Sequence, residues 1–556
     1  MIGVIASGQE KESVAEFFQL FKTPWEFYRS GRDYAVLITT QAYAPGDQSK
    51  LVICFEPCGQ LKDVPGDKPA AGPGPIVLLH EGLDIPLYCG LASPDGDGEP
   101  ILFADGGRKC AGVKSNTPRP VIRLGYNLFR ETGYLLARGQ PRDCSRIPTL
   151  ERHIALLRDL ILESGIPLVE IPPVPCEYSY VAALTHDIDF FRLRDHRFDR
   201  TMLGFIYRAS AGSVVRFLRG RLSLGNLLKN WLTLLELPLI YLGLRRDPWE
   251  QIPAYMELEA ASGSTFFLIP FKGCAGEPPA SGGNALRAAK YDIADLGDTL
   301  KDMARKGFEI ALHGVDAWQG RDRAVAERDR VSALSGTSEM GVRIHWLYRN
   351  GDTPNVLDDA GFAYDSTCGY NDAVGFRAGT AQAYRPRGAK RLMELPLCVQ
   401  DTAMFYADRM DLTGQQARAL CDEIRAAVRT HGGALTLLWH DRSLAPERLW
   451  GEFYRELLQQ LAGDRAWVTT AGKSVRWFLK RREAAFEGVN VDGGAIEVRV
   501  SAPETKPGDG DLPGLVLRVH GTAGRKSASG GSKQHKMCMD YPLKANTTMR
   551  VELPAA

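Results

Sequence analysis

The 556-residue sequence predicts an α/β protein whose main part consists of repeated strand–helix units. Two observations favour this class. From Ser264 onward, short apolar runs typical of strands alternate with segments of helical periodicity. Residues able to do chemistry stand at the ends of these runs. Repeated strand–helix–strand units indicate parallel strands, in a barrel or an open sheet, and chemistry in such folds lies at the carboxyl ends of the strands.

The opening strand of this part is predicted at 181–189, V-A-A-L-T-H-D-I-D. Residues i and i+2 of an extended chain point the same way, so Asp187 and Asp189 should face one site. Two neighbouring carboxylates repel unless a cation or a proton lies between them. The pair therefore indicates a metal ion or a base beside one, while a capped strand end is the simpler alternative.

The later strands are predicted to end in polar residues as well. We expect strands at 264–269, 308–312, 341–345, 362–365, 392–397 and 434–440. The residues at or just after the ends of five of them are His313, Arg343 with His345, Asp365, Glu394 and His440. Each alone could be a strand cap or a core histidine with satisfied hydrogen bonds. Their coincidence predicts that the strand ends converge on one mouth.

The length and the changes of pattern predict four parts. We expect a small α/β domain at 1–150, a helix with a proline-rich linker at 151–177, the strand–helix domain at 178–482 and a small β-rich module at 483–556. The first part lacks a phosphate-binding glycine pattern, and the last alternates Val and Ile with polar residues. Neither flanking part carries a readable catalytic motif.

A basic helical insertion is expected at 192–246. It holds eleven Lys or Arg against three Asp or Glu, with apolar residues between them. Such a segment could make peripheral contact with an anionic membrane or hold an anionic or lipid-linked substrate. A helical excursion packed on the core is the simpler alternative.

The composition excludes few classes. The formal net charge is +1, which gives no reason to expect nucleic acid as a partner. The eleven cysteines are dispersed, as is typical of reduced thiols in the cytoplasm, and the first residues do not resemble a signal peptide. The most apolar window, 231–244, is too short for a membrane span and predicts a buried or interfacial helix. We expect a cytoplasmic protein. A peripheral position at the inner face of the membrane and the oligomeric state are left open.

With these residues in order, 178–480 resembles the polysaccharide deacetylase family of metal-dependent carbohydrate esterases, which share a distorted, TIM-like (β/α) barrel. T-H-D-I-D is similar to the D-x-D opening motif of a bacterial subgroup of that family. The resemblance implies that Asp187 is the catalytic base and that Asp189 is a metal ligand.

The second and third motifs depart from the family pattern. The family's H-x-x-x-H supplies two metal ligands, but L-H-G-V-D-A-W supplies His313 and then has Ala317. The missing donor could be Asp316, a water or His345. The family's R-x-P motif reads R-I-H-W here, so Arg343 should pair with the base and His345 stands where proline is usual. We expect His345 to replace the lost ligand.

The closing motif L-x-H matches Leu438-Trp439-His440, and the resemblance makes His440 the general acid. Glu394 and Asp401 could orient His440 or be structural. The resemblance also leads us to expect substrate contacts from Trp346, Asp365, Arg377 and Trp439.

The implied function is a bacterial hydrolase of carbohydrate metabolism that uses a divalent metal, with zinc expected. It would remove an N-acetyl group from an amino-sugar-containing glycan or glycoconjugate. Two alternatives stay open. One is a domain that has lost the chemistry and binds carbohydrate or acts as a scaffold. The other is a deformylase or amidase that acts on another non-peptide C–N bond.

Overall fold

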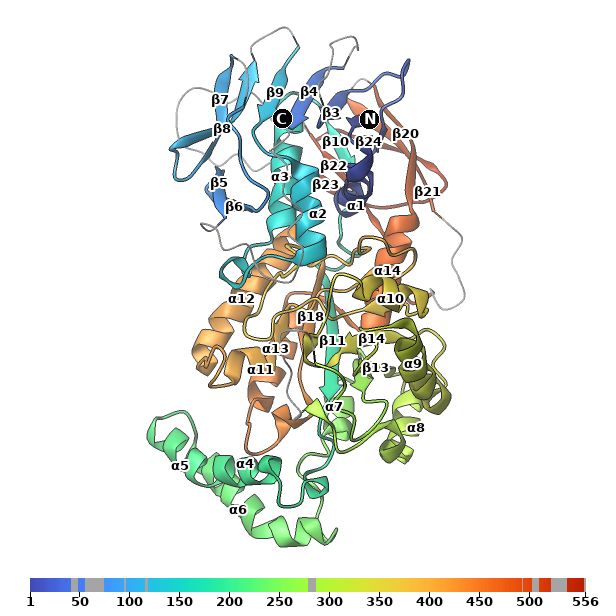
Figure 1. The fold of residues 1–556 in the computed structure, drawn as a ribbon. Helices are drawn as coiled ribbons and strands as arrows, with labels where there is room; N and C mark the ends of the chain where they lie inside the picture. The colour runs from blue at the N-terminus through green and yellow to red at the C-terminus, as the bar shows by residue number, and fades with distance from the viewer. Residues whose placement is uncertain are drawn as a thin grey trace.

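The computed structural model describes the chain except residues 42–48, 56–74, 95–96, 116–118, 279–286, 493, 503–509, 522–537 and 555–556. It is a mixed α/β protein with two large sheets (Figure 1). The N-terminal sheet lies at the top of this view, the central sheet lies below it, and three helices project at the bottom.

The N-terminal sheet has nine strands in the order β2-β1-β3-β4-β9-β8-β7-β5-β6. Its first five strands run parallel and the others pair antiparallel. The strands are β1 (Ile2–Ile5), β2 (Trp25–Phe27), β3 (Val36–Thr39), β4 (Leu51–Phe55), β5 (Ile76–His80), β6 (Leu83–Leu87), β7 (Glu99–Ala104), β8 (Lys109–Ser115) and β9 (Val121–Leu124). The helices are α1 (Lys11–Phe21), α2 (Leu128–Arg138) and α3 (Thr149–Leu162), with 3-10 turns η1 (Gly8–Glu10) and η2 (Arg142–Cys144).

The central sheet is wholly parallel and follows the order β16-β15-β14-β13-β12-β11-β18-β17, with β19 also paired to β11. Its strands are β11 (Val181–Ile188), β12 (Thr265–Leu268), β13 (Glu309–Gly314), β14 (Gly341–Ile344), β15 (Tyr364–Asp365), β16 (Met393–Glu394), β17 (Val399–Gln400), β18 (Ala434–Leu438) and β19 (Trp467–Thr469). This curled parallel sheet fits the expected deacetylase-like (β/α) barrel, of which it forms an incomplete circuit.

Helices alternate with these strands and cover the outside of the sheet (Figure 1). They are α7 (Ile252–Leu258), α8 (Asp298–Arg305), α9 (Arg321–Ser335), α10 (Thr353–Asp359), α11 (Asp401–Phe405), α12 (Gly414–His431), α13 (Gly451–Gly463) and α14 (Ala471–Glu483). Short 3-10 turns lie at η3 (Leu193–Asp195), η5 (Ile293–Leu296), η6 (His345–Leu347) and η7 (Asp441–Leu444). The largest apolar core of the molecule lies between these helices and the central sheet.

Strand β11 is an interior strand of this sheet, between β12 and β18. All eight of its residues are buried, because β18 pairs with it on one side, β19 and β12 pair with its first and second halves on the other, and helices cover it. A strand buried on both faces reads as a near-continuous apolar run, as V-A-A-L does here. Its carboxyl end points toward the bottom of Figure 1.

The basic insertion forms three helices, α4 (Arg200–Ala209), α5 (Ala211–Leu218) and α6 (Leu224–Tyr241). They lie at the bottom of Figure 1, at the end of the molecule opposite the N-terminal sheet. None of the helices in the described residues is long and apolar enough to cross a membrane.

The C-terminal residues form antiparallel strands in two small sheets, β20-β21-β24 and β10-β22-β23. Their bounds are β10 (Leu168–Glu170), β20 (Ala485–Asp492), β21 (Ala495–Ser501), β22 (Val516–His520), β23 (Cys538–Pro542) and β24 (Thr548–Glu552). The segment 166–177, expected to be only a linker, thus contributes β10 to a sheet with β22.

One predicted helix is wrong in its first half. The apolar residues Trp450, Phe453, Tyr454, Leu457 and Leu458 predict one helix over 442–461, but η7 is followed by an irregular stretch and α13 begins only at Gly451. Pro446 lies in this stretch. Proline disfavours helical backbone at the residue before it, which accounts for the break.

Candidate metal centre

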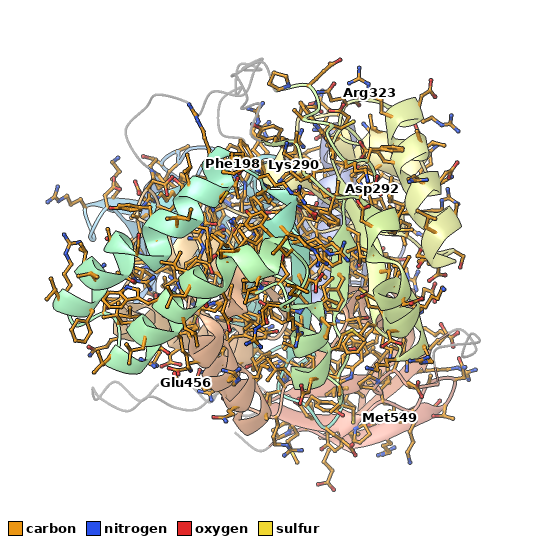
Figure 2. The ribbon with its side chains drawn as sticks, turned by 90° about the horizontal axis from the view of Figure 1, so that it is seen from below. Phe198, Lys290, Asp292, Arg323, Glu456 and Met549 are labelled. Carbon is orange, nitrogen blue, oxygen red and sulfur yellow. The ribbon has the colours of Figure 1, made fainter. Side chains whose placement is uncertain are left out.

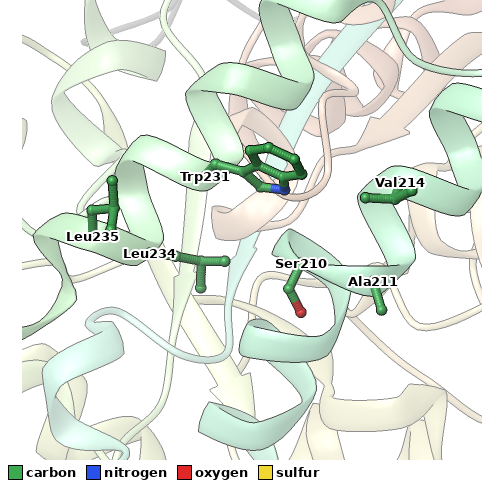
Figure 3. Close-up of a pocket in the computed structure, with 6 residues that line it drawn as sticks. All are labelled: Ser210, Ala211, Val214, Trp231, Leu234 and Leu235. Carbon is green, nitrogen blue, oxygen red and sulfur yellow. The ribbon is translucent and has the colours of Figure 1, made fainter.

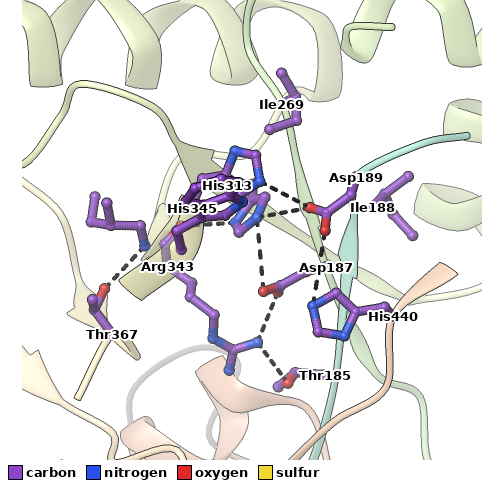
Figure 4. Close-up of polar contacts among 12 residues, drawn as sticks. Thr185, Asp187, Ile188, Asp189, Ile269, His313, Arg343, His345, Thr367 and His440 are labelled. Carbon is purple, nitrogen blue, oxygen red and sulfur yellow. Dashed lines mark hydrogen bonds and ion pairs between the residues drawn. The ribbon is translucent and has the colours of Figure 1, made fainter. Parts of the chain in front are cut away.

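At the end of β11, successive side chains point to opposite faces of the sheet. Asp187 and Asp189 point to one face and enter a polar cluster (Figure 4). His186, between Thr185 and Asp187, points to the other face, where Glu259 and the carbonyl oxygen of Trp439 bind its ring. The period of two along a strand therefore separates the two aspartates from the neighbouring histidine.

Three potential metal ligands from the ends of three strands lie together: Asp189, His313 and His345. Asp189 follows β11, His313 lies near the end of β13 and His345 follows β14. One ligand atom from each residue lies within 4.8 Å of the other two. Asp189 Oδ1 is 3.2 Å from His313 Nε2 and 3.5 Å from His345 Nε2 (Figure 4).

The protonation of these groups suits a cation. His313 donates from Nδ1 to the carbonyl oxygen of Arg343 at 3.0 Å, which orients the ring so that Nε2, the nitrogen available to a metal, faces Asp189. Burial lowers the pKa of His345 to about 3, although Asp189 opposes the shift, so its ring is neutral. Burial alone would raise the pKa of Asp189, but His345, His313 and His440 hold it well below its usual range.

Two atoms of the cluster are buried without a hydrogen-bond partner, Asp189 Oδ1 and His345 Nδ1. A buried carboxylate oxygen without a donor is costly unless a cation satisfies it. Ligands about 2.0–2.2 Å from a tetrahedral zinc ion stand about 3.3–3.6 Å apart. The two distances from Asp189 Oδ1 agree with that spacing, so the residues present fit a zinc-like ion.

The structure also addresses the alternative third ligand. Asp316 accepts a hydrogen bond from the Glu277 backbone and lies 3.6 Å from Arg323, so it belongs to another cluster. Ala317 is fully buried in the apolar core. His345, rather than Asp316, thus stands with Asp189 and His313.

Asp187 is held by Arg343 beside these ligands. Arg343 Nη1 donates to Asp187 Oδ1 and to Thr185 Oγ1, both at 2.9 Å, and its side chain is completely buried. The other oxygen, Asp187 Oδ2, lies 3.8 Å from His313 Nε2. One oxygen of Asp187 is thus anchored by the guanidinium while the other faces the candidate metal ligands.

His440 faces the cluster from the side of β18. Its Nδ1 donates to Asp401 Oδ1 at 2.6 Å, and its backbone N–H donates to Asp401 Oδ2 at 2.7 Å. Its Nε2 is therefore directed toward Asp189 Oδ2, 3.9 Å away. Burial would lower the pKa of His440, but Asp401, Asp189 and Asp187 raise it to about 10, so the ring carries a proton at neutral pH.

Not every predicted strand end reaches this cluster, which corrects the expectation of a single mouth. Asp365 binds the backbone N–H and hydroxyl of Thr367, and Glu394 accepts from the backbone of Cys368; both acids are buried. Trp439 is also buried and stacks on Phe453. The structure gives Asp365 and Trp439 structural surroundings rather than a place at the mouth.

The other two predicted substrate contacts lie in different settings. The Trp346 ring is 5.9 Å from the His345 ring and half-buried, beside the candidate ligands. Arg377 donates to the carbonyl oxygen of Gly369 and lies over Tyr370. A role in substrate binding stays a prediction for both.

Three residues that hydrogen-bond to residues of the site were given no definite role in the sequence analysis. Thr185 shares the Arg343 guanidinium with Asp187, and its i–2 position to Asp187 was a usable signal. Asp401 proves to be the partner of His440, whereas Glu394 is not. Ser443 donates to Asp401 and completes its hydrogen bonds.

Comparisons with known proteins give a weak likeness. No protein-family model and no curated protein matches the chain. Two solved structures described as polysaccharide deacetylases match the chain. The one from Mycobacterium smegmatis is 19% identical, with a TM-score of 0.34, and the match covers 55% of this chain and 94% of that one. The one from Pseudomonas aeruginosa is 15% identical, with a TM-score of 0.34, and the match covers 57% of this chain and 96% of that one.

A third match is the catalytic domain of a peptidoglycan N-acetylglucosamine deacetylase from Eubacterium rectale (10% identity, 53% and 90% coverage, TM-score 0.25). TM-scores this low carry no weight for this chain.

Proposed function

We propose that the chain is a metal-dependent hydrolase that removes an N-acetyl group from an amino-sugar-containing glycan or glycoconjugate. The observation that carries the proposal is the cluster of Asp189, His313 and His345, with Asp187 and His440 adjoining it. Imidazole nitrogens with one carboxylate oxygen suit zinc and similar ions. A divalent ion held there supplies a Lewis acid that activates water and polarises an acetyl carbonyl.

Asp187 has the position of a general base. Arg343 fixes Oδ1, so the carboxylate cannot turn away, and Oδ2 remains directed at the ligand cluster. A water attacking an acyl carbon in front of the cluster loses its proton to this oxygen.

His440 has the position of a general acid. Asp401 holds its Nδ1, and the protonated Nε2 points into the cluster from the side opposite Arg343 (Figure 4). It donates the proton that a leaving amine needs when the C–N bond breaks. The products are acetate and a free amino group on the sugar.

The test is acetate release from a panel of N-acetylated amino-sugar oligosaccharides, together with metal analysis of the purified protein. We expect about one bound zinc-like ion and release of acetate. Formate release from N-formylated substrates alone would favour a deformylase. Absence of metal and of turnover would favour a carbohydrate-binding or scaffolding role.

The role of the base has its own test. Asp187→Asn should retain the metal, because Asp187 is not in the ligand group, but should lower turnover about 10²–10⁴-fold. Near-normal turnover in this variant would place the base elsewhere.

A further inference from the structure

The three helices of the insertion expose an unusual amount of apolar surface. We call residues 198–246 the α4–α6 module. Of the 22 large apolar side chains that are exposed in the described residues, 14 lie in this module. They are Phe198, Leu203, Tyr207, Val215, Phe217, Leu218, Leu224, Leu228, Trp231, Leu232, Leu235, Leu239, Leu242 and Leu244. Such a concentration marks an interaction surface.

Helix α6 is apolar on both of its faces. Leu227, Leu237 and Ile240 point inward and are buried, as the packed side of a surface helix requires. The outer face should then be polar. Instead it carries an apolar stripe at helical spacing, formed by Leu224, Leu228, Leu232, Leu235, Leu239 and Leu242, which are all exposed. Because this second apolar face is exposed to water, it would be stabilised by contact with another apolar surface.

Basic residues accompany this apolar surface. Residues 200–246 hold eight Lys or Arg and a single acid, Glu236, whereas the whole chain has 68 basic and 67 acidic residues. The exposed basic side chains include Arg200, Arg219, Lys229 and Arg246. Basic residues combined with Leu, Phe and Trp are the composition of helices that lie in the interface of an anionic bilayer.

The module is fixed to the central part of the chain. Phe205, Leu237 and Trp249 form a small apolar core with Ala445. Arg216 donates to the carbonyl oxygens of Glu447 and Arg448, in the loop that follows His440. Seen from below, the green helices lie toward the viewer, with Phe198 at one end of the module (Figure 2). The apolar stripe therefore lies on a module that packs against the loop following His440.

An open apolar groove lies between α6 and the start of α5. It measures about 430 Å³ and is lined by Ser210, Ala211, Val214, Trp231, Leu234 and Leu235 (Figure 3). Among the six lining side chains, only those of Ser210 and Trp231 contain a polar atom. The groove extends the apolar surface into the module and offers space to hydrocarbon chains.

We propose that the α4–α6 module docks the protein on an anionic lipid bilayer, with the exposed leucines of α6 in the interfacial layer and the basic residues at the phosphate groups. The charge of the module is complementary to such a surface. The proposal is independent of the reaction catalysed.

The test is vesicle flotation with the full-length protein. We expect it to float with vesicles of equal parts phosphatidylcholine and phosphatidylglycerol, to bind pure phosphatidylcholine more weakly, and to lose binding as salt is raised. Leu232→Asp should weaken binding about ten-fold or more. Leu334→Asp on α9 is the matched control, since Leu334 is also exposed on a helix, and it should bind as the wild type does.

Because Leu232 is 56% and Leu334 40% exposed, neither change should disturb folding, and thermal melting without vesicles should be unchanged. A wild type that binds neither vesicle overturns the proposal. So does equal loss of binding in both variants. A wild-type dimer that Leu232→Asp dissociates, without vesicle binding, would assign the stripe to a second copy instead. The assay reads binding only, so its failure would leave the proposed hydrolysis standing.

Discussion

Replacing Arg343 by methionine should loosen the strand ends that hold Asp187. The guanidinium is completely buried and donates four hydrogen bonds, to Asp187 Oδ1, Thr185 Oγ1, Ser366 Oγ and the Ser366 carbonyl oxygen, at 2.9–3.0 Å. Methionine has a similar length but offers none of these donors. Asp187, itself 3% exposed, would keep a buried charge without its partner.

The expected cost follows from these contacts. Removing one partner of a buried ion pair costs about 3–5 kcal/mol. Asp187→Asn alone should cost less, because Arg343 keeps its bonds to Thr185 and Ser366. In the double variant the stranded charge is gone, so its cost should fall short of the sum of the two single changes by about 1–3 kcal/mol.

Hydrogen exchange is the suitable assay, because a chain of 556 residues need not unfold in one step. Opening free energies should be compared for peptides that cover β11 and β14, with a chelator present so that metal binding adds nothing. Costs that add within about 0.5 kcal/mol would refute the reasoning, since independent sites behave in that way.

Three further outcomes are expected. His345→Ala should reduce the zinc affinity measured by calorimetry at least about ten-fold. His80→Ala is the control, since His80 lies in the other described cluster that could hold a metal, and it should leave this affinity unchanged. Equal loss of affinity in both variants would contradict the assignment of His345 as a metal ligand. Ala317→His should lower thermal stability by about 1–3 kcal/mol without tighter metal binding, because residue 317 is packed in the core; tighter binding would show that the family ligand can be restored. Burial alone would raise the pKa of Glu170, but nearby Arg158, His520 and Arg518 hold that pKa below its usual value. The stability that ionised Glu170 contributes to the fold is therefore present above the unfolded-state pKa of about 4.3 and is lost as the pH falls further. The melting temperature of Glu170→Gln should therefore lie below that of the wild type at pH 7 and approach it as the pH falls below about 4, and a constant gap would contradict this.

Several features were predictable because they depend on local rules. The apolar run before Thr185 indicated the buried strand β11, and alternation placed Asp187 and Asp189 on one face. The predicted strands 264–269, 308–312 and 434–440 are present as β12, β13 and β18, with ends shifted by a few residues. Repeated strand–helix units predicted a parallel sheet, and the central sheet is parallel throughout.

Other features depend on partners that are distant in sequence. Asp365 and Glu394 end strands as predicted, yet their side chains bind locally and stay outside the cluster. The proline-rich 166–177 segment contains β10, because β22, some 350 residues later, supplies the hydrogen bonds that its own sequence does not indicate. The residues of 166–177 themselves carry no periodic signal of this pairing.

The residues able to ligate, and their alternation along each strand, follow from the amino-acid sequence alone, because backbone geometry points every second side chain of a strand the same way. Which of these residues meet depends on how the chain packs in three dimensions. The curl of the central sheet brings His345 to Asp189 and His313, while burial sets Ala317 and Trp439 in the core. The pairing of β17 with β18 sets Asp401 against His440. A ligand set is defined by distances between strand ends, and these are fixed by packing across the sheet rather than by spacing along the chain.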